Sequence, residues 1–241
     1  MTVTPPQIFP LSLDGVLVRF GQAFTEAANA RALALHGALL ASPPKGFVES
    51  APALAALHVR FDRTATTRAD FEAALRARLD QSADAAPRAP SRIWHIPAAF
   101  GGEDGPQLDD VAARAGLSAE RLVTQFCETD LSVLALGFAP GLPYLGTLPE
   151  NWQMPRLTEL TREVPRGAIT TAIRQIVLFS APSPTGWRWF GRTAFRPFDL
   201  QADQPIALRP GDALRFHAVC DTDLTALEGA PLGGARLEVG A

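Results

Sequence analysis

GFAPGLPYLGTLP, residues 137–149, is the stretch around which the rest of the chain is organised. It follows the apolar run LSVLALG, residues 131–137, which predicts a buried strand. Its closely spaced glycines and prolines predict a loop, because they interrupt both helices and strands. Two interpretations fit this loop: a rigid segment folded under its own apolar side chains, or the wall of a ligand pocket. Tyr144, the only tyrosine of the chain, stands at its centre, and we favour the pocket.

The composition is that of an ordinary globular protein, with 241 residues, 47% hydrophobic, 20% charged and a net charge of -3. This acidic balance argues against a nucleic-acid binder, which would carry a concentrated basic face. Cys127 and Cys220 lie far apart in the sequence and predict free thiols in a reducing cytoplasm. The first residues lack the features of a signal peptide, and no apolar run approaches the roughly 20 residues that span a bilayer. We expect a soluble cytoplasmic protein without membrane contact.

Two domains are expected, at residues 1–85 and 92–241, joined by a linker of turn composition at residues 83–91. The first has the pattern strand, helix, two strands, helix, which indicates an α+β unit. Its expected features are a strand at 11–21 with Leu13, Val16 and Val18 in the core, a helix capped by Thr25, strands at 46–50 and 56–62, and a helix introduced by Thr67 and Asp70 as a capping box.

The second domain opens with a predicted strand at 92–97 and two short helices separated at Gly116, the second capped by Ser118. The helix pair superficially fits a DNA-reading motif, but its second helix offers only Arg121 as a cation. From residue 168 onward, short strands alternate with proline and glycine turns and predict a β-barrel or sandwich. The tail after residue 220 is weakly patterned and is expected to pack loosely.

Candidate binding residues surround the central loop. Arginines held beside proline or glycine are good anchors for a carboxylate or phosphate, because the rigid backbone reduces the cost of ordering them. The predicted substrate-binding residues are Tyr144, Arg156, Arg166, Gln175 and Arg192. The alternative is that these arginines pair with surface acids such as Glu163 and Asp199. Glu103 and Asp104 could act as an acid and a base or merely be solvated.

No catalytic residue can be assigned from the sequence. The four histidines, His36, His58, His95 and His217, have neither metal-ligand spacing nor a nucleophile beside them, so no metal site is expected. Phosphate-binding loops, dinucleotide fingerprints and hydrolase elbows are also missing from the sequence.

Taken in order, the segments FGGEDGPQL, AGLS, GFAPGLPYLG, VPRG, SPTGW, GRT, PFD and PGDALRF form a recognisable set. With SLDGVLVRFG and LHVRFD in the first half, the set resembles the family of KipI and the 5-oxoprolinase B subunit over roughly residues 10–220. This family is also described as allophanate hydrolase subunit 1, or carboxyltransferase subdomains C and D.

The resemblance implies a small N-terminal α+β domain followed by a cyclophilin-like β-barrel domain. It implies a subunit of an ATP-dependent 5-oxoprolinase or allophanate hydrolase-like complex, which acts with two partners on a small amide or carboxylate substrate. The partners are a homologous C component and an A component, and ATP would be bound by the complex. A non-catalytic binding protein of the same fold, similar to a histidine-kinase inhibitor, is the alternative that the resemblance leaves open.

Three departures from the family pattern bear on activity. Phe126 stands where the family usually has a histidine, and Leu131 where it usually has a tyrosine. The family's AGGQTGIYP reads AIRQIVLFS at residues 172–180, which retains Gln175 but replaces three glycines. These changes predict a narrower or reshaped pocket and the loss of an acid–base group. His95 and His217 are the candidates within the chain to replace that histidine.

Overall fold

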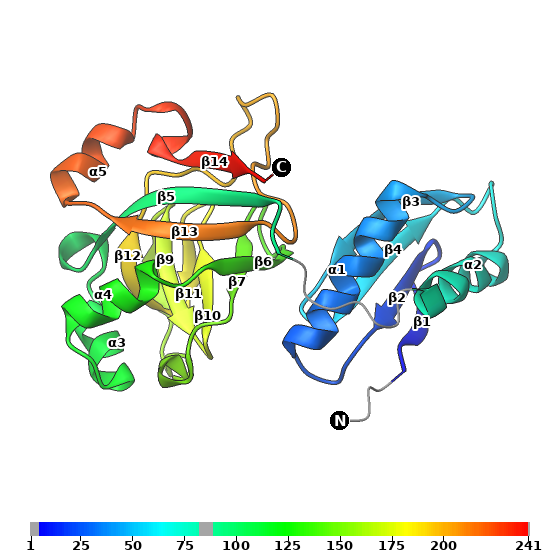
Figure 1. Cartoon of the computed structure of the whole chain (residues 1–241), viewed down its shortest axis with the longest axis horizontal. Helices are drawn as coiled ribbons and strands as arrows, with labels where there is room; N and C mark the ends of the chain where they lie inside the picture. Colours follow the sequence, from blue (N-terminus) through cyan, green and yellow to red (C-terminus); the bar gives the residue numbers. More distant parts are fainter. Residues whose placement is uncertain (1–4, 82–88, 241) are drawn as a thin grey trace. The chain divides into compact units, whose positions relative to one another are not determined.

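The computed structural model describes residues 5–81 and 89–240, which form two compact units, Met1–Ala89 and Pro90–Ala241 (Figure 1). Each unit has its own apolar core. Most of the predicted linker, residues 83–91, lies outside the described residues. Among the described residues no helix is long and apolar enough to span a bilayer.

The first unit is a four-stranded antiparallel sheet with two helices packed on one of its faces. The strands lie in the order β1-β2-β4-β3, and α1 and α2 contribute their apolar faces to one shared core. Its elements are β1 (Gln7–Leu11), β2 (Gly15–Arg19), α1 (Glu26–Ala41), β3 (Phe47–Pro52), β4 (Ala56–Phe61) and α2 (Arg68–Gln81).

Both predicted helix caps of this unit are confirmed. The hydroxyl of Thr25 accepts a hydrogen bond from the backbone N–H of Ala28 at 3.1 Å, and that of Thr67 accepts one from Asp70 at 3.2 Å. The second contact is not a complete capping box, because the Asp70 carboxylate accepts from the Thr67 hydroxyl and not from a backbone N–H.

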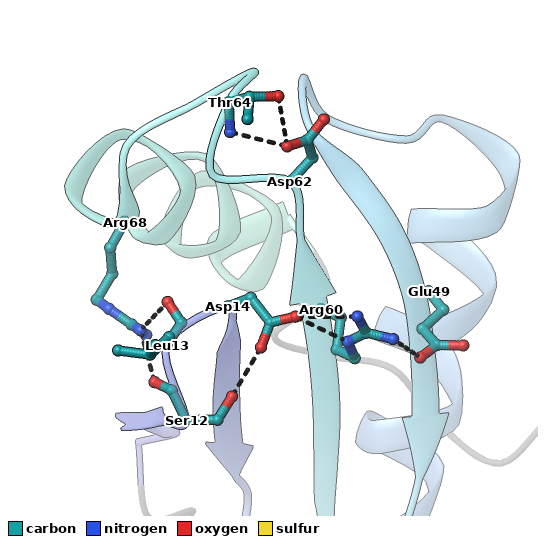
Figure 2. Close-up of polar contacts among 8 residues, drawn as sticks. All are labelled: Ser12, Leu13, Asp14, Glu49, Arg60, Asp62, Thr64 and Arg68. Atoms are coloured by element: carbon teal, nitrogen blue, oxygen red, sulfur yellow. Dashed lines mark hydrogen bonds and ion pairs between the residues drawn. The ribbon is translucent and has the colours of Figure 1, made fainter.

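The single strand predicted at residues 11–21 is wrong. A turn at Ser12 separates β1 from β2, and Ser12 adopts a positive φ of 61°. Leu13 lies on this turn and is 73% exposed, whereas Val16 and Val18 are fully buried as predicted. The guanidinium of Arg68 donates to the carbonyls of Ser12 and Leu13, and this holds the turn in place (Figure 2).

The second unit contains a closed barrel of seven strands, in the order β12-β9-β10-β7-β6-β13-β5, with β5 also pairing with β12. An eighth strand, β14, adds to the other end of β5. The barrel strands are β5 (Arg92–Phe100), β6 (Leu131–Leu136), β7 (Pro143–Gly146), β9 (Ala168–Ala172), β10 (Gln175–Leu178), β12 (Arg188–Arg192) and β13 (Ala213–Ala218), and β14 spans Arg236–Val239. The α+β class with a barrel is thus confirmed.

Helices α3 (Leu108–Ala115) and α4 (Ala119–Cys127) add their apolar side chains to the core inside the barrel. The break between them is as predicted, with Gly116 left-handed at φ 69° and the Ser118 hydroxyl accepting from Arg121. A two-stranded ribbon of β8 (Thr161–Val164) and β11 (Ser183–Thr185) lies outside this sheet. The connecting 3-10 turns are η1 (Gly102–Asp104), η2 (Glu150–Trp152) and η3 (Pro231–Gly234).

The strand predictions for the second unit need two corrections. The segments 193–199 and 205–208 are not strands, and they meet only through an isolated bridge between Phe198 and Ile206. The tail does not pack loosely: it forms α5 (Asp221–Leu227), η3 and β14, which pairs with β5. Strand pairing over a long sequence separation fixes this tail, and local patterning does not reveal such partners.

Candidate functional site

The central loop, residues 137–149, is partly a strand. β7 occupies its middle and pairs with β6 on one side and β10 on the other, which corrects the prediction of an uninterrupted loop. Leu142, Leu145 and Leu148 are buried, as an apolar loop requires, but Phe138 is 79% exposed and has a positive φ of 72°. The loop is therefore built into the barrel wall and leaves one aromatic side chain in solvent.

A second, smaller apolar layer covers the outside of the barrel over β7, β9 and β10. Side chains alternate along β10, so Ile176 and Leu178 enter the barrel core while Val177 faces outward. We call this cluster the outer layer; it comprises Leu142, Val164, Ala168, Ala172, Val177, Phe179 and Trp187, with Ala139, Tyr144 and Trp189 packed against it. Three of the five predicted binding residues lie in or beside this layer.

Gln175 begins β10 on its outward face, opposite Ala172. The residue is only 3% exposed, yet within residues 5–81 and 89–240 its side-chain amide makes no hydrogen bond. Tyr144 lies on the same face, since Val177 stands opposite Tyr144 in the ladder and Gln175 is two residues before Val177. Among the described residues, the fully buried side-chain polar atoms without a hydrogen-bond partner are Arg92 Nε and Ser180 Oγ, so the Gln175 amide still reaches solvent. It is therefore available to a ligand on the barrel face that it shares with Tyr144.

Arg156 reaches this layer through Trp187. Its guanidinium lies over the Trp187 ring at 5.5 Å from the centroid, and the Tyr144 ring meets the same indole edge-on at 6.3 Å. The Arg156 side chain is exposed, and in the described part of the chain it has no ion pair. Tyr144, Arg156 and Gln175 therefore offer a phenol, a free cation and an amide around one apolar floor.

Arg166 and Arg192 belong to a different cluster. Arg192, at the end of β12, contacts the carboxylate of Asp104 and donates to that of Glu228 at 2.7 Å. The Arg192 hydrogen bond is the main cause that lowers the pKa of Glu228, and the positive charges of Arg166 and Arg196 lower it further. Arg192 stands opposite Ala168, whereas Gln175 stands opposite Ala172, so the two clusters are about 13 Å apart along β9.

The alternative interpretation of the arginines holds for this second cluster. Arg192 is neutralised by acids of its own chain, although these are Asp104 and Glu228 and not the two that the sequence suggested. Asp199 pairs instead with Arg196 at 3.6 Å. Asp104 is thereby an ion-pair partner of Arg192 and not a solvated acid.

Two family departures fall inside the barrel. Phe126 and Leu131 are both fully buried in the main core. The Phe126 ring lies 5.1 Å from that of Phe190 and 5.0 Å from that of Phe216. Position 126 of this chain is thus filled by an aromatic packing residue and supplies no acid or base.

The third departure reshapes the turn beside Gln175. Ile173 and Arg174, which replace two family glycines, connect β9 to β10 with positive φ values of 46° and 64°. Glycine adopts such angles without strain, and a β-branched residue rarely does. The turn is held by hydrogen bonds from Ile173 N–H to the Met154 carbonyl and from Leu148 N–H to the Arg174 carbonyl. Val177, at the third glycine position, fills the space between Tyr144 and Thr170 in the outer layer.

The candidate replacement histidines lie elsewhere on the barrel. His95 and His217 project outward from β5 and β13, which are separated from β10 by β6 and β7. Their ring nitrogens are 3.0 Å apart, and the second nitrogen of His95 lies 2.8 Å from the carboxylate of Glu238. Burial and the nearby positive charges lower the pKa of His217. These histidines cannot act on a ligand held at Gln175.

The sequence alone did not indicate that Val177 and Trp187 belong to the outer layer or that Glu228 pairs with Arg192. The alternation of β10 could have indicated Val177, but the roles of Trp187 and Glu228 depend on contacts between distant segments. Throughout the ranges that the structure describes, no group of three histidine, cysteine, aspartate or glutamate side chains is arranged to hold a metal ion.

The chain thus combines a small α+β unit with a unit built on a seven-stranded barrel. Its candidate site, with Gln175 and Tyr144, lies on the outward face of that barrel. The family model "Carboxyltransferase domain, subdomain C and D" matches residues 6–208, and the chain belongs to this family. The family expected from the sequence motifs is therefore confirmed.

Two curated relatives are similar to the chain, and both are named as the B subunit of 5-oxoprolinase. That of Bacillus subtilis (strain 168) is 30% identical over 226 residues, which cover 90% of this chain and 94% of the relative. That of Escherichia coli O157:H7 is 42% identical over 126 residues, which cover 52% of this chain and only 58% of the relative. In the E. coli case, the aligned stretch spans little more than half of that protein's length.

Among solved structures, Kluyveromyces lactis urea carboxylase matches 99% of this chain with a TM-score of 0.74. The sequence identity is 18% and the match covers 24% of that chain, so the likeness concerns the fold alone.

Proposed function

We propose that the protein is one component of an ATP-dependent amide-hydrolysing complex of the 5-oxoprolinase type. The two relatives named as 5-oxoprolinase B subunits support this proposal, and one of them aligns over nearly its whole length. The complex would contain a homologous C component and an A component, and its substrate would be 5-oxoproline or a similar small cyclic amide.

The observation that carries the proposal is the Gln175 amide, which makes no hydrogen bond to a described residue and lies on the same outward barrel face as Tyr144. An amide group can donate to and accept from the amide of a substrate, which suits a lactam with one N–H and one C=O. Arg156, exposed and placed on Trp187, would bind the substrate carboxylate. The role of these groups is to bind and orient the substrate; the residues that transfer protons would come from another component of the complex.

Arg166 and Arg192 have a smaller part in this proposal than the sequence suggested. Arg192 already has two carboxylate partners, so it supports the barrel wall instead of binding substrate. Because Asp104 and Glu228 neutralise it, Arg192 is not available to bind the phosphates of ATP. We therefore place ATP on another component of the complex and assign no step of its chemistry to this chain.

A reconstituted complex tests the proposal. The chain is co-purified with the A and C components, and ATP-dependent hydrolysis of 5-oxoproline is measured with and without it. Turnover that requires this chain and falls at least tenfold in Gln175→Ala supports the role of Gln175, since loss of one hydrogen bond to the substrate has about this effect. The exposed Gln201→Ala is the matched control and should retain activity. Turnover unchanged in Gln175→Ala contradicts the site.

A non-catalytic binding protein of the same fold is the second candidate. The observation that favours it is Val177, whose side chain occupies outer-layer space that a family glycine would leave open. A stable complex with the C component that hydrolyses no small amide would support this second function. Failure to form any complex would overturn the assignment to a multi-component assembly.

A further inference from the structure

The first unit contains a cavity of about 490 Å³ next to the loop that joins β4 to α2. This volume lies within the range of small-molecule sites in proteins. Its lining combines cationic, hydroxyl and apolar side chains: Lys45, Arg63, Thr64, Ala65, Thr66, Thr67, Asp70, Phe71 and Ala74. The cavity takes no part in the proposed function, because all of its residues belong to the first unit.

Three acids at this end of the unit, Asp14, Glu49 and Asp62, have partners within the unit (Figure 2). The Asp62 carboxylate accepts from the backbone N–H of Thr64 at 2.8 Å and from its hydroxyl at 2.7 Å. Asp14 and Glu49 share the guanidinium of Arg60, at 2.9 and 2.8 Å. These contacts lower the pKa of Asp14 and of Asp62, so both carboxylates stay charged and engaged.

The only acid that lines the cavity is engaged in the same way. The Asp70 carboxylate accepts from the Thr67 hydroxyl at 2.7 Å, and the backbone N–H of Asp70 donates back to that hydroxyl. The Asp70 carboxylate is therefore engaged with Thr67, the residue that caps the N-terminus of α2.

Lys45 and Arg63 are the cations of the cavity, and Lys45 is the only lysine of the chain. Neither forms an ion pair with any described residue. The lining therefore carries two unpaired cations against the single carboxylate of Asp70. The nearby Asp62 carboxylate also keeps its charge, because its partners are the neutral groups of Thr64. An anion would therefore be held by direct hydrogen bonds from Lys45 and Arg63 and not by a long-range positive field.

We propose that this cavity binds a small organic anion that carries a phosphate group on an apolar body. Lys45 and Arg63 would contact the phosphate, because ammonium and guanidinium groups form the strong, charge-assisted hydrogen bonds that such an oxyanion accepts. Phe71, which is 1% exposed, and Ala74 supply an apolar floor for the body of the ligand. The cavity exceeds what inorganic phosphate alone would fill.

The test is a titration of the full-length chain with phenyl phosphate, followed by calorimetry and by amide chemical shifts. We expect saturable binding with shifts confined to the cavity, weaker binding of inorganic phosphate, and weaker binding at high salt. The double variant Lys45→Ala/Arg63→Ala should lose at least about tenfold in affinity. The control variant Arg76→Ala removes an exposed cation on α2 that does not line the cavity. This variant should bind phenyl phosphate as tightly as the unaltered chain does.

Both altered side chains are exposed, so the double variant should remain folded, which far-UV circular dichroism checks. Equal binding by the double variant and the unaltered chain would overturn the site. Absence of saturable binding at about 10 mM ligand would overturn it as well. Because the assay needs no other component of the complex, its result is independent of the 5-oxoprolinase proposal.

Discussion

The indole N–H of Trp94 donates to the carboxylate of Asp212 at 3.0 Å in the interior of the second unit. Asp212 also accepts from the backbone N–H of Arg209 and forms an ion pair with Arg92 at 2.9 Å. One carboxylate, 3% exposed, thus joins the turn before β13 to the beginning of β5.

Asp212→Ala should lower the free energy of unfolding of the barrel by about 3–5 kcal/mol, because it leaves the largely buried Arg92 without its counter-ion. Urea unfolding followed by tryptophan fluorescence measures this loss. All four tryptophans lie in the second unit, so the signal reports on that unit alone. Asp203→Ala, at an exposed site, should stay within about 0.5 kcal/mol of the unaltered chain. Similar unfolding midpoints for the two variants would contradict this account.

Ile173→Gly should stabilise the barrel by about 0.5–1 kcal/mol. The gain from removing a left-handed β-branched residue exceeds the added flexibility of the unfolded chain. Ile173→Ala is the matched control: it shortens the side chain but keeps the strained φ, so it should not stabilise. The same fluorescence experiment compares the two, and equal effects of glycine and alanine would show that φ strain is not the cause.

Phe126→His should destabilise the barrel by about 3 kcal/mol and restore no activity. The imidazole would lie among Phe100, Phe190 and Phe216 without a hydrogen-bond partner, and it would leave part of the aromatic volume empty. Thermal unfolding and the 5-oxoproline assay measure the two parts of the prediction. A variant that is more active than the unaltered chain would show that position 126 reaches the substrate.

The barrel should lose stability as the pH falls through about 6.5, the ordinary pKa of an unfolded histidine. Partial desolvation, followed by the charges of His95, Arg215 and Arg236, lowers the pKa of His217, so the unfolded chain takes up its proton first. The acids Glu238 and Asp130 share this surface: Glu238 contacts His95, and Asp130 forms an ion pair with Arg215. His217→Gln should flatten the pH dependence of the urea midpoint between pH 7 and pH 5. A slope unchanged by His217→Gln would assign the effect to another group.

The fold was predictable where local signals determine it. Thr25, Thr67 and Ser118 are capping residues recognisable from residue type and position, and all three act as caps in the structure. Pairing between distant segments was not predictable in this way. β7 is a strand despite Pro143 and Gly146, because β6 and β10 lie on either side of it and supply its hydrogen bonds.

The candidate site was predictable in residue type but not in grouping. The proline- and glycine-flanked arginines looked equivalent in the sequence, yet Arg156 lies on Trp187 while Arg192 is paired with Asp104 and Glu228. Those partners lie 31, 88 and 36 residues away along the chain, and sequence spacing gives no measure of such contacts. Gln175 stands out only once its burial is known.

The double pairing of β5 has a consequence for how the protein is made. β5 emerges early from the ribosome, but its parallel partner β13 ends at Ala218 and its closing partner β12 ends at Arg192. The first unit contains all of its own strand partners and can fold while synthesis continues. The barrel cannot close until nearly the whole second unit has been translated. Nascent chains halted before β13 would therefore carry a folded first unit followed by a protease-sensitive segment.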